Sequence, residues 1–70
     1  MSVQFKIETE REEDGRWIAE VPELPGVLAD GATEVQAVAH VQALALRVVA
    51  DRLEADEAGR DYLEITLRAA

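Results

Sequence analysis

Few side chains in this sequence could perform covalent chemistry. The 70 residues include no cysteine, while Ser2 is the only serine and His40 the only histidine. Nucleophilic catalysis needs a serine or cysteine beside a base, so the sequence excludes that class of enzyme. His40 has no second imidazole with which to share a metal ion, and a solvated position on a helix surface is its simplest interpretation. We therefore expect a protein without enzymatic activity.

Acidic side chains are the one chemically useful type in excess. The chain has fifteen Asp and Glu residues against seven Lys and Arg residues, for a formal net charge of -8. Carboxylates at Glu12, Glu13 and Asp14 could hold a hard cation, but they are consecutive in a predicted turn and are better explained as a solvated loop. The same holds for a second run, which comprises Glu54, Asp56, Glu57 and Asp61. We expect no metal ion and no cofactor.

A metal-dependent ribonuclease-H-like nuclease is the main catalytic alternative. It would need carboxylates that converge from neighbouring strands onto a divalent ion. Glu8, Glu20 and Glu64 lie in predicted strands, but they alternate with apolar residues and should point away from the packed side of the sheet. The pattern therefore disfavours a nuclease.

The charge also limits the binding partners. An acidic surface repels phosphate backbones and anionic lipid headgroups, so we expect no direct binding of nucleic acid and no binding to membranes. A basic protein would instead be attracted, with a salt-sensitive association rate, and a role of the charge in solubility alone stays open. The sequence shows neither a leader-like segment nor an apolar run of membrane-spanning length. This indicates a cytoplasmic protein.

The spacing of apolar residues predicts the elements that hold these side chains. Alternation over residues 3–9 and 17–21 predicts two antiparallel strands, joined by a tight turn at Asp14-Gly15. A turn at Pro25-Gly26 precedes a short third strand over residues 27–29. Thr33 stands three residues before Gln36, the spacing of a capping box, so a helix should begin at about residue 34. It can continue to about residue 55, and a glycine at position 59 can end it.

A last strand completes the predicted fold. Leu63, Ile65 and Leu67 alternate with polar residues and predict a fourth strand. The sequence therefore predicts an α+β fold, a single small domain over residues 1–70 in the order β-β-β-α-β. Its antiparallel sheet should carry one long helix packed on one face, because each element must bury its apolar side.

The predicted helix has an apolar arc wider than one small sheet should cover. At about 100° per residue, one apolar stripe comprises Val35, Val38, Ala39, Ala45, Leu46, Val49 and Leu53. We expect this stripe to pack on the sheet. An adjoining flank comprises Ala37, Val41, Leu44 and Val48. Exposed apolar patches usually mark association surfaces, so the flank is predicted to contact a partner or a second copy.

Association would also compensate for the small size of the domain. A chain this short buries only about 60% of its unfolded surface, and it has no cysteine for a disulfide. We therefore expect a homo-oligomer, either a dimer or a tetramer. Trp17 and neighbouring Arg16 are further candidate interface residues because these residue types are enriched in interface hot spots. A core position is the simpler interpretation of Trp17.

The segment GRWIAEVPELPGV, residues 15–27, resembles the N-terminal domain of HicB-type antitoxins. In that family an aromatic residue precedes an Ala-x-Val/Ile-Pro-x-Leu-Pro-Gly core, and a Gly-x-Thr turn opens the helix. The matching residues here are Trp17, Ala19 to Gly26, and Gly31 to Thr33, and the resemblance spans nearly the whole chain. It implies a partial ribonuclease-H-like fold that has lost the catalytic carboxylates.

The resemblance also implies a role in a toxin–antitoxin system. The implied partner is a HicA-type toxin, a small basic protein that cleaves messenger RNA, and the antitoxin covers its active site. Family members commonly carry a C-terminal DNA-binding domain, whereas we expect none in residues 1–70. An orphan, self-associating binding domain without a toxin partner is therefore the alternative.

Overall fold

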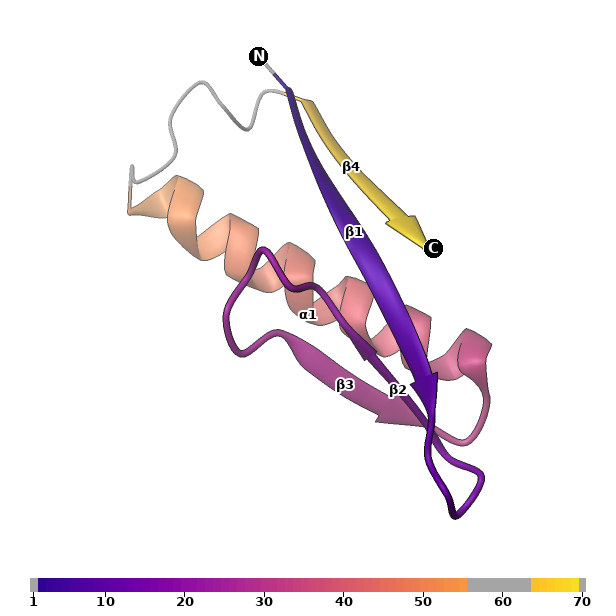
Figure 1. The fold of residues 1–70 in the computed structure, drawn as a ribbon. Helices are drawn as coiled ribbons and strands as arrows, with labels where there is room; N and C mark the ends of the chain where they lie inside the picture. Colours follow the sequence, from indigo (N-terminus) through magenta and orange to yellow (C-terminus); the bar gives the residue numbers. More distant parts are fainter. Residues whose placement is uncertain (1, 56–63, 70) are drawn as a thin grey trace.

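The computed structural model describes residues 2–55 and 64–69 and shows one helix packed on one face of a sheet (Figure 1). Strand β1 spans Ser2–Arg11, β2 spans Trp17–Glu20 and β3 spans Leu28–Gly31. Helix α1 follows over Glu34–Glu54, and β4 spans Glu64–Ala69. The α+β class and the order β-β-β-α-β are confirmed. The predicted helix end at Gly59 and the start of the last strand at Leu63 lie outside the described residues.

The strands form a four-stranded sheet in the order β3-β2-β1-β4. The first three strands pair antiparallel, with Thr9 opposite Ala19 and Ala19 opposite Ala29. The one difference from the predicted sheet is that β4 pairs parallel to β1, so the sheet is mixed. Parallel neighbours need a long crossover connection. Helix α1 supplies it, because it carries the chain from β3 at one edge to β4 at the other (Figure 1).

Two turns shape the strands. In the β1–β2 hairpin, the amide of Glu12 donates to the carbonyl of Arg16 at 2.7 Å, and Gly15 has a φ of 92° that favours glycine. After β2, the amide of Val21 donates to the carbonyl of Val27 and the amide of Val27 to the carbonyl of Leu24, both at 3.0 Å. This loop turns the Leu24 side chain into the core, where it is 1% exposed.

The start of α1 is capped much as its sequence predicts. The hydroxyl of Thr33 accepts a hydrogen bond from the amide of Gln36 at 3.1 Å. The Gln36 side chain reaches back, but its oxygen accepts from the amide of Ala32 at 3.0 Å, one residue before the capping position. Both interactions satisfy backbone donors that a helix start leaves without partners.

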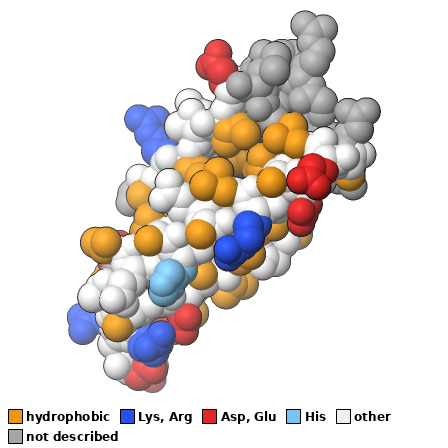
Figure 2. Space-filling model, turned by 180° about the vertical axis from the view of Figure 1, so that it is seen from behind, with side chains coloured by type: hydrophobic (Ala, Val, Ile, Leu, Met, Phe, Trp, Pro, Cys, Tyr) orange, Lys and Arg blue, Asp and Glu red, His pale blue; other side chains and the backbone are white. Residues whose placement is uncertain are grey.

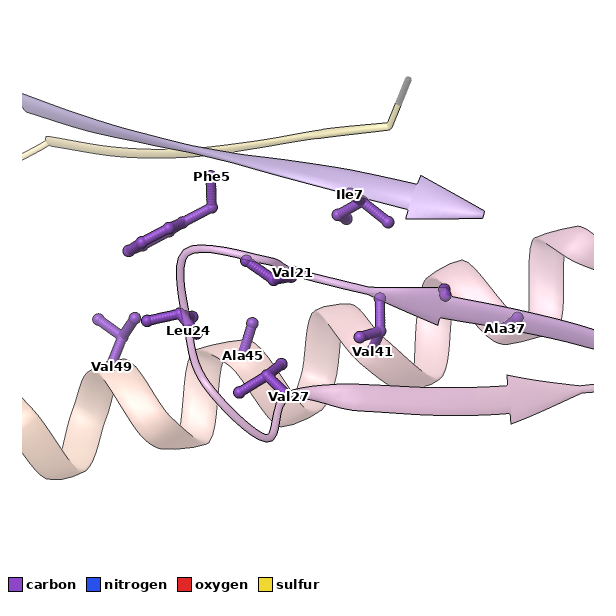
Figure 3. Packing of buried hydrophobic residues seen from close by; sticks show 10 residues of the cluster. Phe5, Ile7, Val21, Leu24, Val27, Ala37, Val41, Ala45 and Val49 are labelled. Atoms are coloured by element: carbon purple, nitrogen blue, oxygen red, sulfur yellow. The ribbon is translucent and has the colours of Figure 1, made fainter. Parts of the chain in front are cut away.

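The core lies between α1 and the inner face of β1, β2 and the 21–27 loop (Figure 3). Its buried members are Phe5, Ile7, Ala19, Val21, Leu24, Val27, Ala37, Val41, Ala45 and Val49. The predicted packing face of the helix is therefore wrong in most of its members. Val35 is 79% exposed, Leu46 48% and Leu53 43%.

Helix α1 instead packs on the sheet through a face that includes much of the flank predicted to contact a partner. Ala37 and Val41 are both 0% exposed, while Leu44 and Val48 are half-buried against the same core. The reason lies in the sheet, where Gly31 approaches the start of the helix closely. A Cβ at this glycine would lie 2.6 Å from the backbone nitrogen of Ala37. Small side chains at the contact fix which face the helix presents.

No helix within residues 2–55 and 64–69 is both long and apolar enough to cross a membrane.

Candidate partner-binding surface

The outer face of the sheet, which points away from α1, carries more acidic than basic side chains. Strand alternation places on it Gln4, Lys6, Glu8 and Glu10 of β1, Ile18 and Glu20 of β2, Leu28 and Asp30 of β3, and Glu64, Thr66 and Arg68 of β4. Their neighbours Phe5, Ile7 and Ala19 are buried on the other face. The predicted outward orientation of Glu8 and Glu20 is therefore confirmed, and so is that of Glu64, because the next residue, Ile65, packs against the core.

Two carboxylates face each other on this surface. Glu8 stands opposite Glu20 in the β1–β2 register, and both side chains are exposed. Like charges directly opposite one another destabilise a sheet. This arrangement costs stability in the free domain, and a cationic partner would relieve it.

The β1–β2 hairpin extends the acidic surface past the end of the sheet. A hollow of about 520 Å³ opens there, lined by Glu12, Glu13, Asp14, Arg16, Ile18 and Asp30. The Oδ1 atom of Asp14 accepts a hydrogen bond from the amide of Arg16 at 3.0 Å. Four carboxylates thus surround a half-buried isoleucine, so the hollow has an apolar floor and a negative rim.

Among the described residues that line the hollow, Arg16 is the one cation. Its guanidinium lies 3.2 Å from a carboxylate oxygen of Asp30, and the two side chains are 50% and 65% exposed. An ion pair this exposed contributes little to stability. Arg16 therefore remains accessible on the outer face, as a candidate interface residue should be.

The remaining predicted interface residues do not join Arg16 on one surface. Trp17 points to the inner face, where it is half-buried and packs against the core. Ala37 and Val41 have no exposed surface to offer a partner. Leu44 and Val48 keep part of their surface open on α1, on the opposite side of the molecule from Arg16. Contact of Arg16, Trp17, Leu44 and Val48 with a partner stays a prediction.

His40 has a structural contact that its sequence position did not indicate. Its Nδ1 atom lies 2.7 Å from the backbone carbonyl oxygen of Asp30. Asp30 stands opposite Ile18 in the register, at a position where the β3 backbone groups point to the free edge of the sheet. The exposed imidazole therefore ties α1 to the β3 edge and occupies one of its open acceptors.

Within residues 2–55 and 64–69, no three His, Cys, Asp or Glu side chains are grouped so that they could hold a metal ion. Three of the acids in the predicted run near the helix end, at positions 56, 57 and 61, lie outside the described residues.

The residues that carry the family resemblance act mainly in folding. Leu24 fills the core, Gly26 has a φ of 82°, and Thr33 caps the helix. Ala37 is buried where Gly31 leaves room for it. The motif thus specifies the turn geometry and the helix contact, while the acidic face lies on residues between the motif positions. Comparison of the chain with protein-family models, with curated proteins and with solved structures finds no match.

Proposed function

We propose that this domain is a non-catalytic cytoplasmic binding module that holds a small basic protein on the outer face of its sheet. The observation that carries the proposal is the concentration of charge. Strands and loops over residues 2–33 and 64–69 hold nine acidic against four basic side chains, whereas α1 holds three against two. The field of the domain therefore directs a cationic partner to the sheet and the hairpin.

The chemistry of this face suits arginine and lysine side chains. The hollow beside the hairpin can admit an alkyl stem over Ile18 while the cationic head meets the carboxylates of Glu12, Glu13 and Asp14. Leu28, 52% exposed on the same face, offers an apolar contact next to Glu20. An apolar centre with a charged rim is the usual anatomy of a protein interface.

The resemblance to HicB-type antitoxins supports a particular basic partner, a HicA-type toxin. A protein that cleaves messenger RNA must attract a polyanion, so its active site carries positive charge. A rigid sheet lined with carboxylates presents a similar charge pattern and competes for the same surface. Covering that active site requires no catalytic group in this chain.

Inhibition of RNA cleavage tests this function directly. A purified HicA-type toxin should lose its cleavage of messenger RNA when this domain is added in slight excess. Binding measured by calorimetry should weaken steeply as salt rises from about 0.05 to 0.3 M, because exposed charges are then screened.

Two charge-reversal variants locate the surface. Glu20→Lys on the outer face should weaken binding of the toxin at least tenfold. Glu54→Lys, at an exposed position on α1, makes the same change in charge and should leave binding nearly unchanged. Equal effects of both variants, or a toxin that stays active in excess domain, would contradict the proposal.

A further inference from the structure

Helix α1 has an exposed face without charged side chains, which we call the uncharged face. Its apolar members are Val35, Ala39, Ala43, Leu46, Ala50 and Leu53, and all of them are exposed. Gln42 is its one polar member. Figure 2 shows hydrophobic side chains gathered along this side of the molecule, next to a strip that bears charged residues and the histidine. Exposed apolar patches of this kind usually mark association surfaces.

The charge distribution identifies that partner. The sheet and the hairpin of two copies would repel each other, because acids outnumber bases there by nine to four. Helix α1 is nearly balanced, and its charged residues, including Arg47 and Asp51, lie off the uncharged face. In the proposed function, on which this step rests, a basic protein binds the opposite side of the molecule. The surface at which a second acidic copy meets the least repulsion is therefore this face of α1.

We propose that two copies of this chain pack through the uncharged face, with their α1 helices antiparallel about a two-fold axis. The spacing of the large side chains is self-complementary in this arrangement. Val35 of each copy faces Leu53 of the other, and Gln42 faces Leu46, since each pair of positions is centred on the same point of the helix. The alanines between them let the helices approach closely.

A hollow beside the uncharged face can hold one of the large side chains of the second copy. It has a volume of about 290 Å³ and is lined by Thr9, Glu34, Val35, Val38 and Ala69. It lies where the start of α1 passes the end of β4. In the antiparallel pair, Leu53 of the second copy arrives next to Val35 and fills this hollow. The half-buried Ile65 and Leu67 of β4 extend the apolar surface on the same side of the sheet.

The oligomeric state tests the proposal. Light scattering at micromolar concentration should give the mass of a dimer for the wild-type chain. Leu46→Lys should give a monomer with unchanged circular dichroism. The matched control is Leu28→Lys, because Leu28 is 52% exposed and Leu46 48%, and it should remain a dimer. A monomeric wild-type chain, or a dimer lost in the Leu28 variant and kept in the Leu46 variant, would overturn the proposal.

Cysteine cross-linking tests the orientation, because the chain has no cysteine of its own. Val35→Cys and Leu53→Cys are made as separate proteins, mixed in equal amounts and oxidised. The mixture should form a disulfide-linked pair, while each protein alone should not. Within one chain the two positions are about 27 Å apart along the helix, far beyond the Cα separation of about 7 Å that a disulfide allows. Cross-linking of each variant with itself but not in the mixture would refute the antiparallel arrangement.

Discussion

Gly31 determines how closely the helix lies on the sheet. It stands opposite Trp17 at the end of β3, and its Cα approaches the first turn of α1. A Cβ there would lie 2.6 Å from the Ala37 nitrogen and 2.8 Å from the Gln36 Cβ. The nitrogen belongs to the backbone of a capped helix and cannot move alone, so any side chain at position 31 must displace the helix.

We therefore expect Gly31→Ala to lower the free energy of unfolding by about 1–3 kcal/mol, the usual cost of overpacking a core. Urea denaturation monitored by circular dichroism measures it. Gly26→Asn is the comparison, because nothing lies within 4 Å of a Cβ at Gly26 and asparagine tolerates its φ of +82°. Gly31 is not at a positive φ, so a Gly31→Ala protein as stable as the wild type would show that the helix accommodates the extra methyl group without cost.

Val41 shows which face of the helix supports the fold. It is 0% exposed and packs between Ala37 and Ala45 in the core. Val41→Glu would bury a carboxylate without a partner. The cost should exceed the whole stability of a domain of this size, about 4–10 kcal/mol, so we expect loss of the helical circular dichroism signal.

The control for this variant is Val35→Glu, at a position that is 79% exposed. A carboxylate in the first turn also interacts favourably with the helix dipole, so the fold should be kept. A folded Val41→Glu protein would mean that the helix can turn its other apolar face to the sheet.

At the scale of elements, much of the fold follows from sequence. Alternation over β1 and the turn residues between the strands predict the sheet, and Thr33 with Gln36 predicts the helix start to the residue. The direction of β4, which pairs parallel to β1, does not follow from its residues, because apolar alternation is the same in parallel and antiparallel strands. Only the crossover through α1 decides it.

The packing face of α1 could not be predicted from the size of its side chains. Val35, Leu46 and Leu53 are large and lie on one side of the helix, so they resemble a core stripe, yet they are exposed. The sheet presents Ala19, Ala29 and Gly31 toward the helix, and the close approach of Gly31 to the backbone of Ala37 places the small Ala37 at the contact. Choosing between two neighbouring apolar faces therefore requires knowledge of the facing strands, which a helical wheel does not contain.

The opposed carboxylates of Glu8 and Glu20 lower the stability of the β1–β2 pair, and a single substitution can remove this repulsion. Glu20→Lys replaces a repulsive cross-strand pair with an attractive one, and should raise the free energy of unfolding by about 0.5–1 kcal/mol at low salt. Glu10→Lys makes the same change in net charge, but its cross-strand neighbour is Ile18. Glu10→Lys should therefore raise the free energy of unfolding less than Glu20→Lys does. If both variants gain equally, the benefit comes from net charge and not from the pair.

At the scale of the whole molecule, the same charges act in opposite directions on stability and on binding. A net charge of -8 on 70 residues repels itself in the compact state. Among the described residues the excess of acids lies on the strands and loops, which hold nine acidic against four basic side chains, whereas α1 holds three against two. Any change that screens the outer face should therefore stabilise the free domain and weaken its attraction for a cation.

Salt provides that change without a mutation. Raising NaCl from about 0.02 to 0.3 M shortens the screening length from roughly 20 Å to below 10 Å. The free domain should gain on the order of half a kcal/mol, which raises its Tm by roughly 2–4 °C. Over the same range the complex with a basic partner should weaken, because its attraction uses the same carboxylates.

Association through the uncharged face of α1 should respond differently again, and strengthen slightly as repulsion between the two acidic copies is screened. Calorimetric melting of the free domain, titration with the partner and light scattering across one salt series measure the three responses. A self-association that weakened with salt in parallel with partner binding would mean that both interactions use the acidic sheet. The uncharged face of α1 would then not be the surface of self-association.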